Sequence, residues 1–384
     1  MFRYVVVHYN EIGIKGDNRI FFEKKLISNI KSSLNLKLEI QRRYGYILIK
    51  LNNENDISEI NSKLQLLPGI AHFSFATSCE SDIQKIKEKS LELLKKSEFQ
   101  TFKIDAKRSN KSFSLNSMEI NQTVGEYILN NLQKKVDIHN PEKTLYIEVS
   151  DKETYIFDNK IKGVGGLPIG SGEKVICSLS GGIDSPVSAY EFMKRGCEVV
   201  LVHIFNNTLV NNNLLKKIKD LAKQLQKIQH KVKLYVVPFA EIQKEIVTNI
   251  HPKYRMIIYR RYMLKIINKI ANEEKIKLVI TGDSVGQVAS QTVSNLHSIY
   301  EASKLPVLSP LITYNKDDTV NVAKKIGTYE ISILQYPDCC SYMIAVHPET
   351  KSNLEDILDQ EKEIKPKEEQ LINSALEQKQ IFEY

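Results

Sequence analysis

Residues 174–185 read KVICSLSGGIDS: an apolar run, a turn of small residues and the start of a helix. The apolar run at residues 175–179 predicts a buried strand. Gly181 and Gly182 let the backbone turn tightly and bring its N–H groups against an anion, and the helix start adds the positive end of its dipole. The stretch therefore predicts a phosphate-binding loop. It is not a Walker loop, because the GxxxxGK[ST] pattern is missing.

Downstream of this loop, short apolar strands alternate with helices. We expect helices at residues 185–195, 214–228 and around 241–272, strands at 198–204, 232–238 and 278–281, and a further strand and helix after residue 306. This alternation is typical of an α/β fold with a doubly wound parallel sheet, whose ligands bind at the carboxyl ends of the strands.

Upstream, strands and helices alternate without a glycine-rich phosphate loop. Strands are expected at residues 2–9, twice within 36–51, at 70–77, at 99–106 and on both sides of residue 150, and helices at 18–34, 57–66, 83–96 and 119–134. The order of the first elements resembles a small ferredoxin-like α+β unit, and a second unit follows Pro68 and Gly69. The run GVGGLPIGSG at residues 163–172 marks a linker.

The charge of the chain is unevenly distributed. Its formal net charge is +8, and residues 211–277 hold 16 Lys and Arg against 5 Asp and Glu, whereas residues 349–384 hold 5 against 10. A basic body favours a polyanionic partner such as a nucleic acid. The alternative is a bias toward lysine on solvated helix faces.

The segment KRSNKS at residues 107–112 places three cations, Lys107, Arg108 and Lys111, among small hydrogen-bonding residues between a strand and a helix. Such a loop can bind phosphates and thereby position a nucleic acid without reading its bases. As an ordinary loop it would simply be solvated.

Cysteine usage and hydropathy bear on the compartment. The five cysteines include no CxxC pair, which favours a reducing compartment, and we expect the cytoplasm. The N-terminal run MFRYVVVHYN is too short and polar for a signal peptide or membrane span, and no later run is long enough. We therefore expect no membrane association.

Eight sequence motifs follow one another along the chain: KIDAKRSNKSF, GVGGLPIGSGEKV, SGGIDSPVSAYEFMKRG, VHIFN, YRMIIYRR, TGDSVGQVASQT, PVLSPLITYNKDD and PDCC. SGGIDS resembles the loop of the PP-loop ATP pyrophosphatases, and the whole set resembles the tRNA 4-thiouridine synthetases, or tRNA sulfurtransferases, in the version without a rhodanese domain. The resemblance implies an N-terminal ferredoxin-like domain at 1–56, a THUMP RNA-binding domain at 57–162, a linker at 163–173 and a PP-loop domain at 174–384. That last domain would have the adenine nucleotide alpha hydrolase-like fold and end in an acidic helical tail.

The resemblance also implies an ATP site and its residues. Asp184 would be catalytic and work through Mg²⁺ on the pyrophosphate, and Lys316 would be a further catalytic residue. The loop residues expected to bind the pyrophosphate are Ser180, Gly181, Gly182 and Ser185. The residues expected around the adenosine are Ser178, Leu179, His203, Ile204, Arg260, Gly282 and Gln291.

The adjacent cysteines Cys339 and Cys340 are candidates for sulfur chemistry, because a thiolate can take up sulfane sulfur and attack an electrophile. The resemblance places a persulfide-bearing cysteine in the PDCC segment. We favour Cys339 for the persulfide and Cys340 for resolving the disulfide left after transfer, and the reverse assignment stays open.

The resemblance implies that ATP adenylates a uridine of tRNA, expected at position 8, and that persulfide sulfur then replaces its oxygen. The expected partners are tRNA, a cysteine desulfurase or separate carrier as sulfur donor, a carrier protein of thiamine thiazole synthesis as a second acceptor, and a second copy of the chain in a homodimer. Two alternatives stay open: another PP-loop enzyme, such as a 2-thiouridine synthetase, or a non-catalytic tRNA-binding protein.

Overall fold

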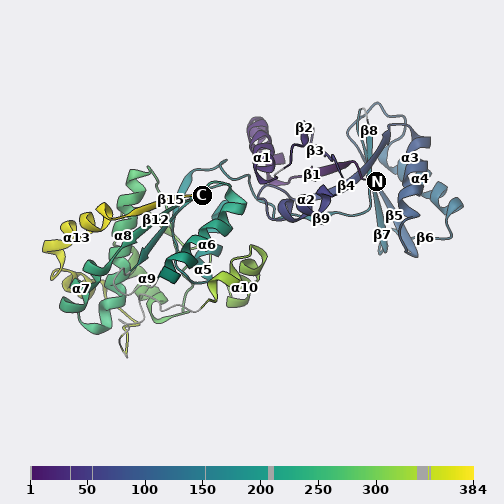
Figure 1. The fold of residues 1–384 in the computed structure, drawn as a ribbon. Coiled ribbons are helices and arrows are strands. Elements are labelled where there is room, and N and C mark those ends of the chain that lie inside the picture. The colour runs from purple at the N-terminus through teal and green to yellow at the C-terminus, as the bar shows by residue number, and fades with distance from the viewer. Residues whose placement is uncertain are drawn as a thin grey trace. The chain divides into compact units, whose positions relative to one another are not determined.

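The computed structural model describes residues 2–34, 36–53, 55–151, 153–205, 212–334, 345 and 347–384. The chain forms two compact units, Met1–Pro168 and Ile169–Tyr384 (Figure 1). The border between them falls inside the glycine-rich stretch that was expected to be a linker. The described residues contain no helix that meets the length and hydropathy needed to span a lipid bilayer.

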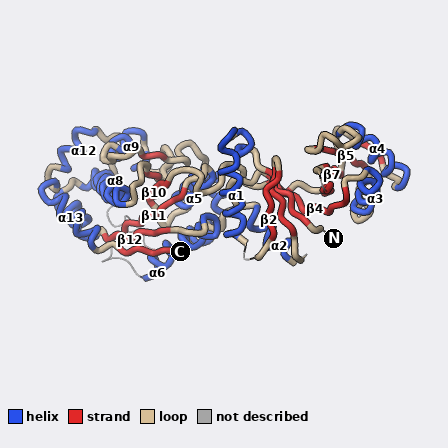
Figure 2. Tube along the Cα trace, turned by 90° about the horizontal axis from the view of Figure 1, so that it is seen from above, coloured by secondary structure: helices blue, strands red, loops and turns tan. Residues whose placement is uncertain are grey.

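The first unit is an α+β structure built on one sheet (Figure 2). Its strands follow the order β2-β3-β1-β4-β8-β7-β5-β6, and β9 pairs with β4. Its strands and helices are β1 Tyr4–His8, α1 Arg19–Ser33, β2 Glu39–Arg43, β3 Tyr46–Lys50, α2 Asp56–Leu64, β4 His72–Glu80, α3 Ile83–Leu94, β5 Thr101–Arg108, α4 Ser117–Asn131, β6 Lys135–Val136, β7 Lys143–Val149, β8 Glu153–Phe157 and β9 Ile161–Lys162.

Strand β4 joins the two halves of this sheet. Its residues 72–76 pair with β1, and its residues 77–80 pair with β8. Each half has its own apolar core, one beneath α1 and α2 and the other beneath α3 and α4. Helix α2, which follows the predicted border at residue 56, packs in the first of these cores through Ile60 and Leu64.

The second unit has a six-stranded sheet in the order β14-β13-β10-β11-β12-β15. Its strands and helices are β10 Lys174–Ser178, α5 Asp184–Lys194, β11 Glu198–Phe205, α6 Asn212–Gln229, β12 Lys233–Pro238, α7 Ala240–Asn249, α8 Arg255–Glu273, β13 Val279–Ile280, α9 Val293–Tyr300, β14 Val307–Leu308, α10 Lys316–Lys325, α11 Tyr329–Ser332, α12 Leu354–Glu361, α13 Lys365–Glu377 and β15 Gln380–Glu383. Strands β10 to β14 pair in parallel, which confirms the predicted fold class.

The last residues differ from the helical tail that the sequence suggested. After α12 and α13, Gln380–Glu383 form β15, which pairs antiparallel with β12. Lys219 lies 3.9 Å over the Phe382 ring. The backbone groups at the edge of β12 need hydrogen-bond partners, and the run Gln-Ile-Phe-Glu supplies them with residues suited to a strand.

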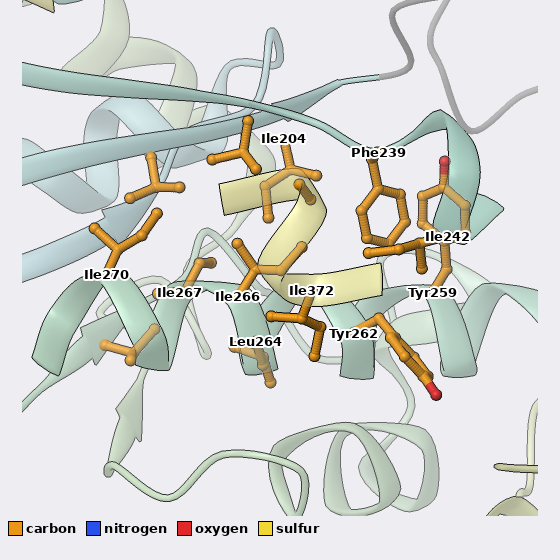
Figure 3. Close-up of a cluster of buried hydrophobic side chains, with 14 of the residues drawn as sticks. Ile204, Phe239, Ile242, Tyr259, Tyr262, Leu264, Ile266, Ile267, Ile270 and Ile372 are labelled. Carbon is orange, nitrogen blue, oxygen red and sulfur yellow. The ribbon is translucent and has the colours of Figure 1, made fainter. Parts of the chain in front are cut away.

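An apolar core of the second unit lies between the sheet and α8 (Figure 3). Ile267 and Ile270 of α8 are buried against the strands, and the rings of Phe239 and Tyr259 meet edge to face at 4.7 Å. Helices α5 and α6 contact strands of the same sheet. The parallel strands are therefore packed by α8 and by these two helices.

An ion network joins α8 to the two helices after residue 353. Arg261, of which 2% is exposed, donates to Glu361 at 2.9 Å and to Glu301 at 2.9 Å. Lys265 donates to Glu361 at 3.0 Å and to Glu368 at 2.7 Å. Glu361 therefore carries the negative charge that two cations of α8 share.

Glu361→Gln is expected to lower the free energy of unfolding by about 3 kcal/mol at pH 7, because it removes one partner of a buried ion pair. Burial alone would raise the pKa of Glu361, but Arg261 and Lys265 lower it below the ordinary value of 4.5. A depressed folded-state pKa makes this contribution complete above pH 4.5 and lost as the pH falls through the lower folded-state value.

Urea unfolding at pH 7 and at several values below pH 4.5 measures this effect, and the two proteins should converge in acid. Glu245→Gln, which alters the exposed pair with Lys367, is the matched control and should change little. A difference for Glu361→Gln that is the same at every pH would contradict the electrostatic account.

Candidate active site

A cavity of about 690 Å³ lies in the second unit where β10 and β11 end. Strand β10 has β11 on one side and β13 on the other, so the chain changes direction across the sheet here, which is where such folds bind ligands. All the residues predicted to bind ATP line this cavity, and so does Asp184: Ser178, Leu179, Ser180, Gly181, Gly182, Ser185, His203, Ile204, Arg260, Gly282 and Gln291.

The serines of the loop close it on itself. The backbone N–H of Ser180 donates to Ser185 Oγ at 2.8 Å, and the two hydroxyl oxygens are 3.0 Å apart. Ile183, the residue before α5, has an apolar side chain that cannot cap the helix. A helix start without a side-chain cap can bind an anion through its first N–H groups.

Gly282 allows the turn after β13 to approach the start of α5. A Cβ atom at this position would lie 2.8 Å from the backbone N of Ser185 and 3.0 Å from its Cα. Both atoms are backbone and cannot move aside cheaply. The glycine is therefore required by close packing against the loop.

Asp184 is held between two side chains from distant parts of the sequence. Lys316, at the start of α10, places its Nζ 2.7 Å from Asp184 Oδ1, and Gln287 Nε2 donates to Oδ2 at 2.9 Å. Lys316, which the family resemblance implies is catalytic, therefore contacts Asp184 directly. Gln287 was not among the predicted site residues.

Asp283 connects two of the predicted residues. Arg260 donates to both of its carboxylate oxygens at 2.7 Å, and Gln291 Nε2 donates to Oδ1 at 3.0 Å. The Tyr300 hydroxyl donates to Oδ2 at 2.6 Å. Burial alone would raise the pKa of Asp283, but the charge of Arg260 and the hydrogen bond from Tyr300 lower it, so the carboxylate is ionised near neutral pH.

His203 and the apolar residues near it form one wall of the cavity. His203 Nδ1 lies 2.8 Å from the carbonyl oxygen of Leu179, which fixes the end of β10 against β11. The apolar residues that line this wall include Ile204, Met256 and Met263. Such a wall suits the flat face of a nucleobase.

Lys217 is a buried cation beside the loop, with 7% of the residue exposed. Its Nζ donates to the carbonyl oxygens of Ser332 at 2.7 Å and Leu334 at 2.8 Å. A Cβ added to Gly181 would lie 3.6 Å from the same Nζ. No sequence pattern predicts that Lys217 is buried beside the loop, because a lysine in an amphipathic helix usually faces solvent.

The predicted cysteines Cys339 and Cys340 lie outside the described residues. Among the described cysteines, Cys177 is fully buried, and burial raises its pKa to about 12. Burial likewise raises the pKa of Cys79 to about 11. Both groups therefore remain neutral thiols near pH 7, as expected of packing residues.

The three predicted RNA-binding cations lie at the end of β5 and in the loop after it. Lys107 and Lys111 are exposed. Arg108 instead donates to the carbonyl oxygens of Lys111 at 3.3 Å and Phe113 at 3.0 Å, so it holds the loop in shape. The loop therefore presents two exposed lysines on a framework fixed by the arginine.

Comparison with known proteins gives a consistent result over the whole chain. Three family models match it: the ThiI ferredoxin-like domain at residues 4–74, the THUMP domain at 80–158 and the thiamine biosynthesis protein (ThiI) at 170–365. A probable tRNA sulfurtransferase of Thermoanaerobacter sp. (strain X514) is 39% identical, with 94% of this chain and 95% of that protein aligned.

A second protein of the same name, from Clostridium acetobutylicum, is 41% identical over 99% of this chain and 98% of its own length. Among solved structures, a 4-thiouridine synthetase in complex with RNA and with bound ATP matches with a TM-score of 0.89 and 34% identity, covering 100% of both chains. From its domains, its relatives and its fold, the chain belongs to the ThiI family.

Proposed function

We propose that this protein is an ATP-dependent tRNA sulfurtransferase that converts a uridine of tRNA, expected at position 8, to 4-thiouridine. The loop from Ser180 to Ser185 lines one cavity together with all the other residues predicted to bind ATP, and this observation carries the proposal. The similarity to a 4-thiouridine synthetase with bound RNA and ATP supports it.

In this proposal the pyrophosphate end of ATP binds the N–H groups of the loop and of the first turn of α5. The adenosine lies against Leu179 and Ile204, and Arg260 and Gln291 bind around it. The uridine O4 attacks the α-phosphorus and the bond to the β-phosphate breaks, which releases pyrophosphate and leaves AMP attached to the base. AMP is then a good leaving group at C4.

Asp184 fits Mg²⁺, because its carboxylate oxygens border the cavity and Mg²⁺ prefers oxygen ligands from one or two carboxylates together with substrate phosphates. Lys316 lies next to the same carboxylate and would add positive charge where the pyrophosphate departs. When bound, Mg²⁺ would stabilise the negative charge that develops on the leaving group.

Sulfur transfer is assigned to Cys339 and Cys340. Leu334 accepts a hydrogen bond from Lys217 beside the loop, and Cys339 follows Leu334 by five residues, a length of chain that spans at most about 18 Å. The terminal sulfur of the Cys339 persulfide would attack C4 and expel AMP. The Cys340 thiolate would then attack Cys339 Sγ, which breaks the persulfide S–S bond, leaves the outer sulfur on C4 and forms a Cys339–Cys340 disulfide. The resulting disulfide needs a thiol reductant before the next turnover.

The partners follow from this chemistry. A cysteine desulfurase supplies the persulfide sulfur, directly or through a separate carrier protein, and a carrier protein of thiamine thiazole synthesis is the second acceptor that the family resemblance implies. Lys107 and Lys111, on the loop that Arg108 holds, would bind phosphates of the tRNA. ATP and tRNA are cytoplasmic substrates, in keeping with the cysteine usage.

Incubation of the protein with ATP, tRNA, cysteine and a cysteine desulfurase should produce 4-thiouridine, measured by mass spectrometry of digested tRNA. Formation of 2-thiouridine instead would refute the proposed position of attack, and no ATP turnover in the presence of tRNA would favour a binding protein. If about six phosphates are contacted, tRNA affinity should fall roughly 10³-fold from 50 to 200 mM salt. A flat salt response would contradict the phosphate contacts.

A further inference from the structure

Asp283 determines the orientation of the Gln291 side-chain amide. Asp283 is buried and ionised, so both of its oxygens only accept hydrogen bonds. Gln291 can therefore bond to it only through its NH₂ group, at 3.0 Å. The carbonyl oxygen of the same amide must point elsewhere.

That carbonyl oxygen, Gln291 Oε1, is buried and has no hydrogen-bond partner among the described residues. Gln291 also lines the cavity. A buried acceptor without a donor costs free energy, and each such group in a folded protein calls for an explanation. A ligand that brings a donor to this atom would supply one.

The chemistry of the donor is limited by the surroundings. Phosphate oxygens are acceptors and would repel Oε1. Arg260 also favours an uncharged ligand group here, because its charge is balanced by the two hydrogen bonds to Asp283. The groups of a nucleotide that can donate are the ribose hydroxyls and the amino group of adenine.

We propose that Asp283 is a positioning residue that fixes the Gln291 amide so that its Oε1 accepts a hydrogen bond from the nucleoside part of the ligand. The inference rests on the proposed function, because it takes ATP as the ligand. Asp283 would act through Gln291, and the Gln291 carbonyl oxygen would be a point at which the site discriminates between nucleotides.

Calorimetric titration of the full-length protein with ATP, 2′-deoxy-ATP, 3′-deoxy-ATP and purine riboside triphosphate, which lacks the amino group, tests the proposal. The wild type should bind one of the three analogues about 10-fold more weakly than ATP, since the analogue leaves Oε1 without a donor. The analogue that binds more weakly identifies the donor as the 2′-hydroxyl, the 3′-hydroxyl or the adenine amino group.

Asp283→Asn should remove this discrimination. An asparagine amide can donate to Gln291 Oε1, so the glutamine amide can turn over and ATP should lose about 10-fold in affinity. Gln291→Met, which removes the acceptor at similar size, should likewise bind ATP and the analogue within about 2-fold of each other. Pyrophosphate affinity should not fall in either variant.

Glu245→Gln serves as the matched charge control, because Glu245 forms an exposed ion pair with Lys367. It should keep the full discrimination, and thermal unfolding should show that each variant is folded. Equal binding of all four nucleotides by the wild type, or full discrimination by Asp283→Asn, would overturn the inference while leaving ATP binding intact. A wild type that binds none of the nucleotides would refute the proposed function as well.

Discussion

Asp184→Asn should slow pyrophosphate release in the presence of tRNA by about 10³-fold, which is the size of effect seen when one group that stabilises transition-state charge is removed. The change keeps the size of the side chain but removes the charge that pairs with Lys316 at 2.7 Å and that fits Mg²⁺. Single-turnover measurement of labelled pyrophosphate measures it. ATP affinity should change only a few-fold, because the loop N–H groups remain.

Asp220→Asn is the matched control, since Asp220 lies on α6 near Lys223 at the surface, at 4.0 Å. It should retain the wild-type rate. Retention of more than a tenth of the rate by Asp184→Asn would contradict a catalytic role for this carboxylate. The proposed ATP site would then need another residue to hold the metal.

Cys339→Ser should abolish 4-thiouridine formation, a loss of at least about 10³-fold, while single-turnover pyrophosphate release continues. A serine hydroxyl cannot carry sulfane sulfur, whereas adenylation of the uridine needs only the cavity. Mass spectrometry of the tRNA and of the protein after exposure to a cysteine desulfurase measures the product and the persulfide. The two readouts separate sulfur transfer from adenylation.

Cys340→Ser should form the persulfide and lose turnover, and a strong external thiol should restore part of its activity by releasing the sulfur. Cys197→Ser is the control, because Cys197 is a partly buried free thiol in the described part of the second unit. If Cys340→Ser loses the persulfide and Cys339→Ser keeps it, the two roles are exchanged. Full activity of both variants would refute the sulfur mechanism.

Residues 174–185 were sufficient, without the structure, to predict a buried strand, a phosphate-binding loop and the start of a helix. Strands and helices of the second unit depend on apolar patterning and on glycine, which act within a few residues, so the parallel-sheet class was predictable and is confirmed. The positions of the motifs proposed to bind ATP were predictable from the family resemblance. The cavity they line was not visible in any single motif.

Tertiary structure alone decided how distant residues meet. Asp283 and Gln287 contact predicted site residues, and Lys217 lines the same cavity, through chain reversals that no local pattern reports. The same holds for β4, which joins two halves of one sheet, and for β15, which pairs with β12 at the sheet edge. The physical reason is that periodicity and turn residues report the local backbone, whereas hydrogen-bond partners across a sheet or cavity depend on which groups burial leaves to be satisfied.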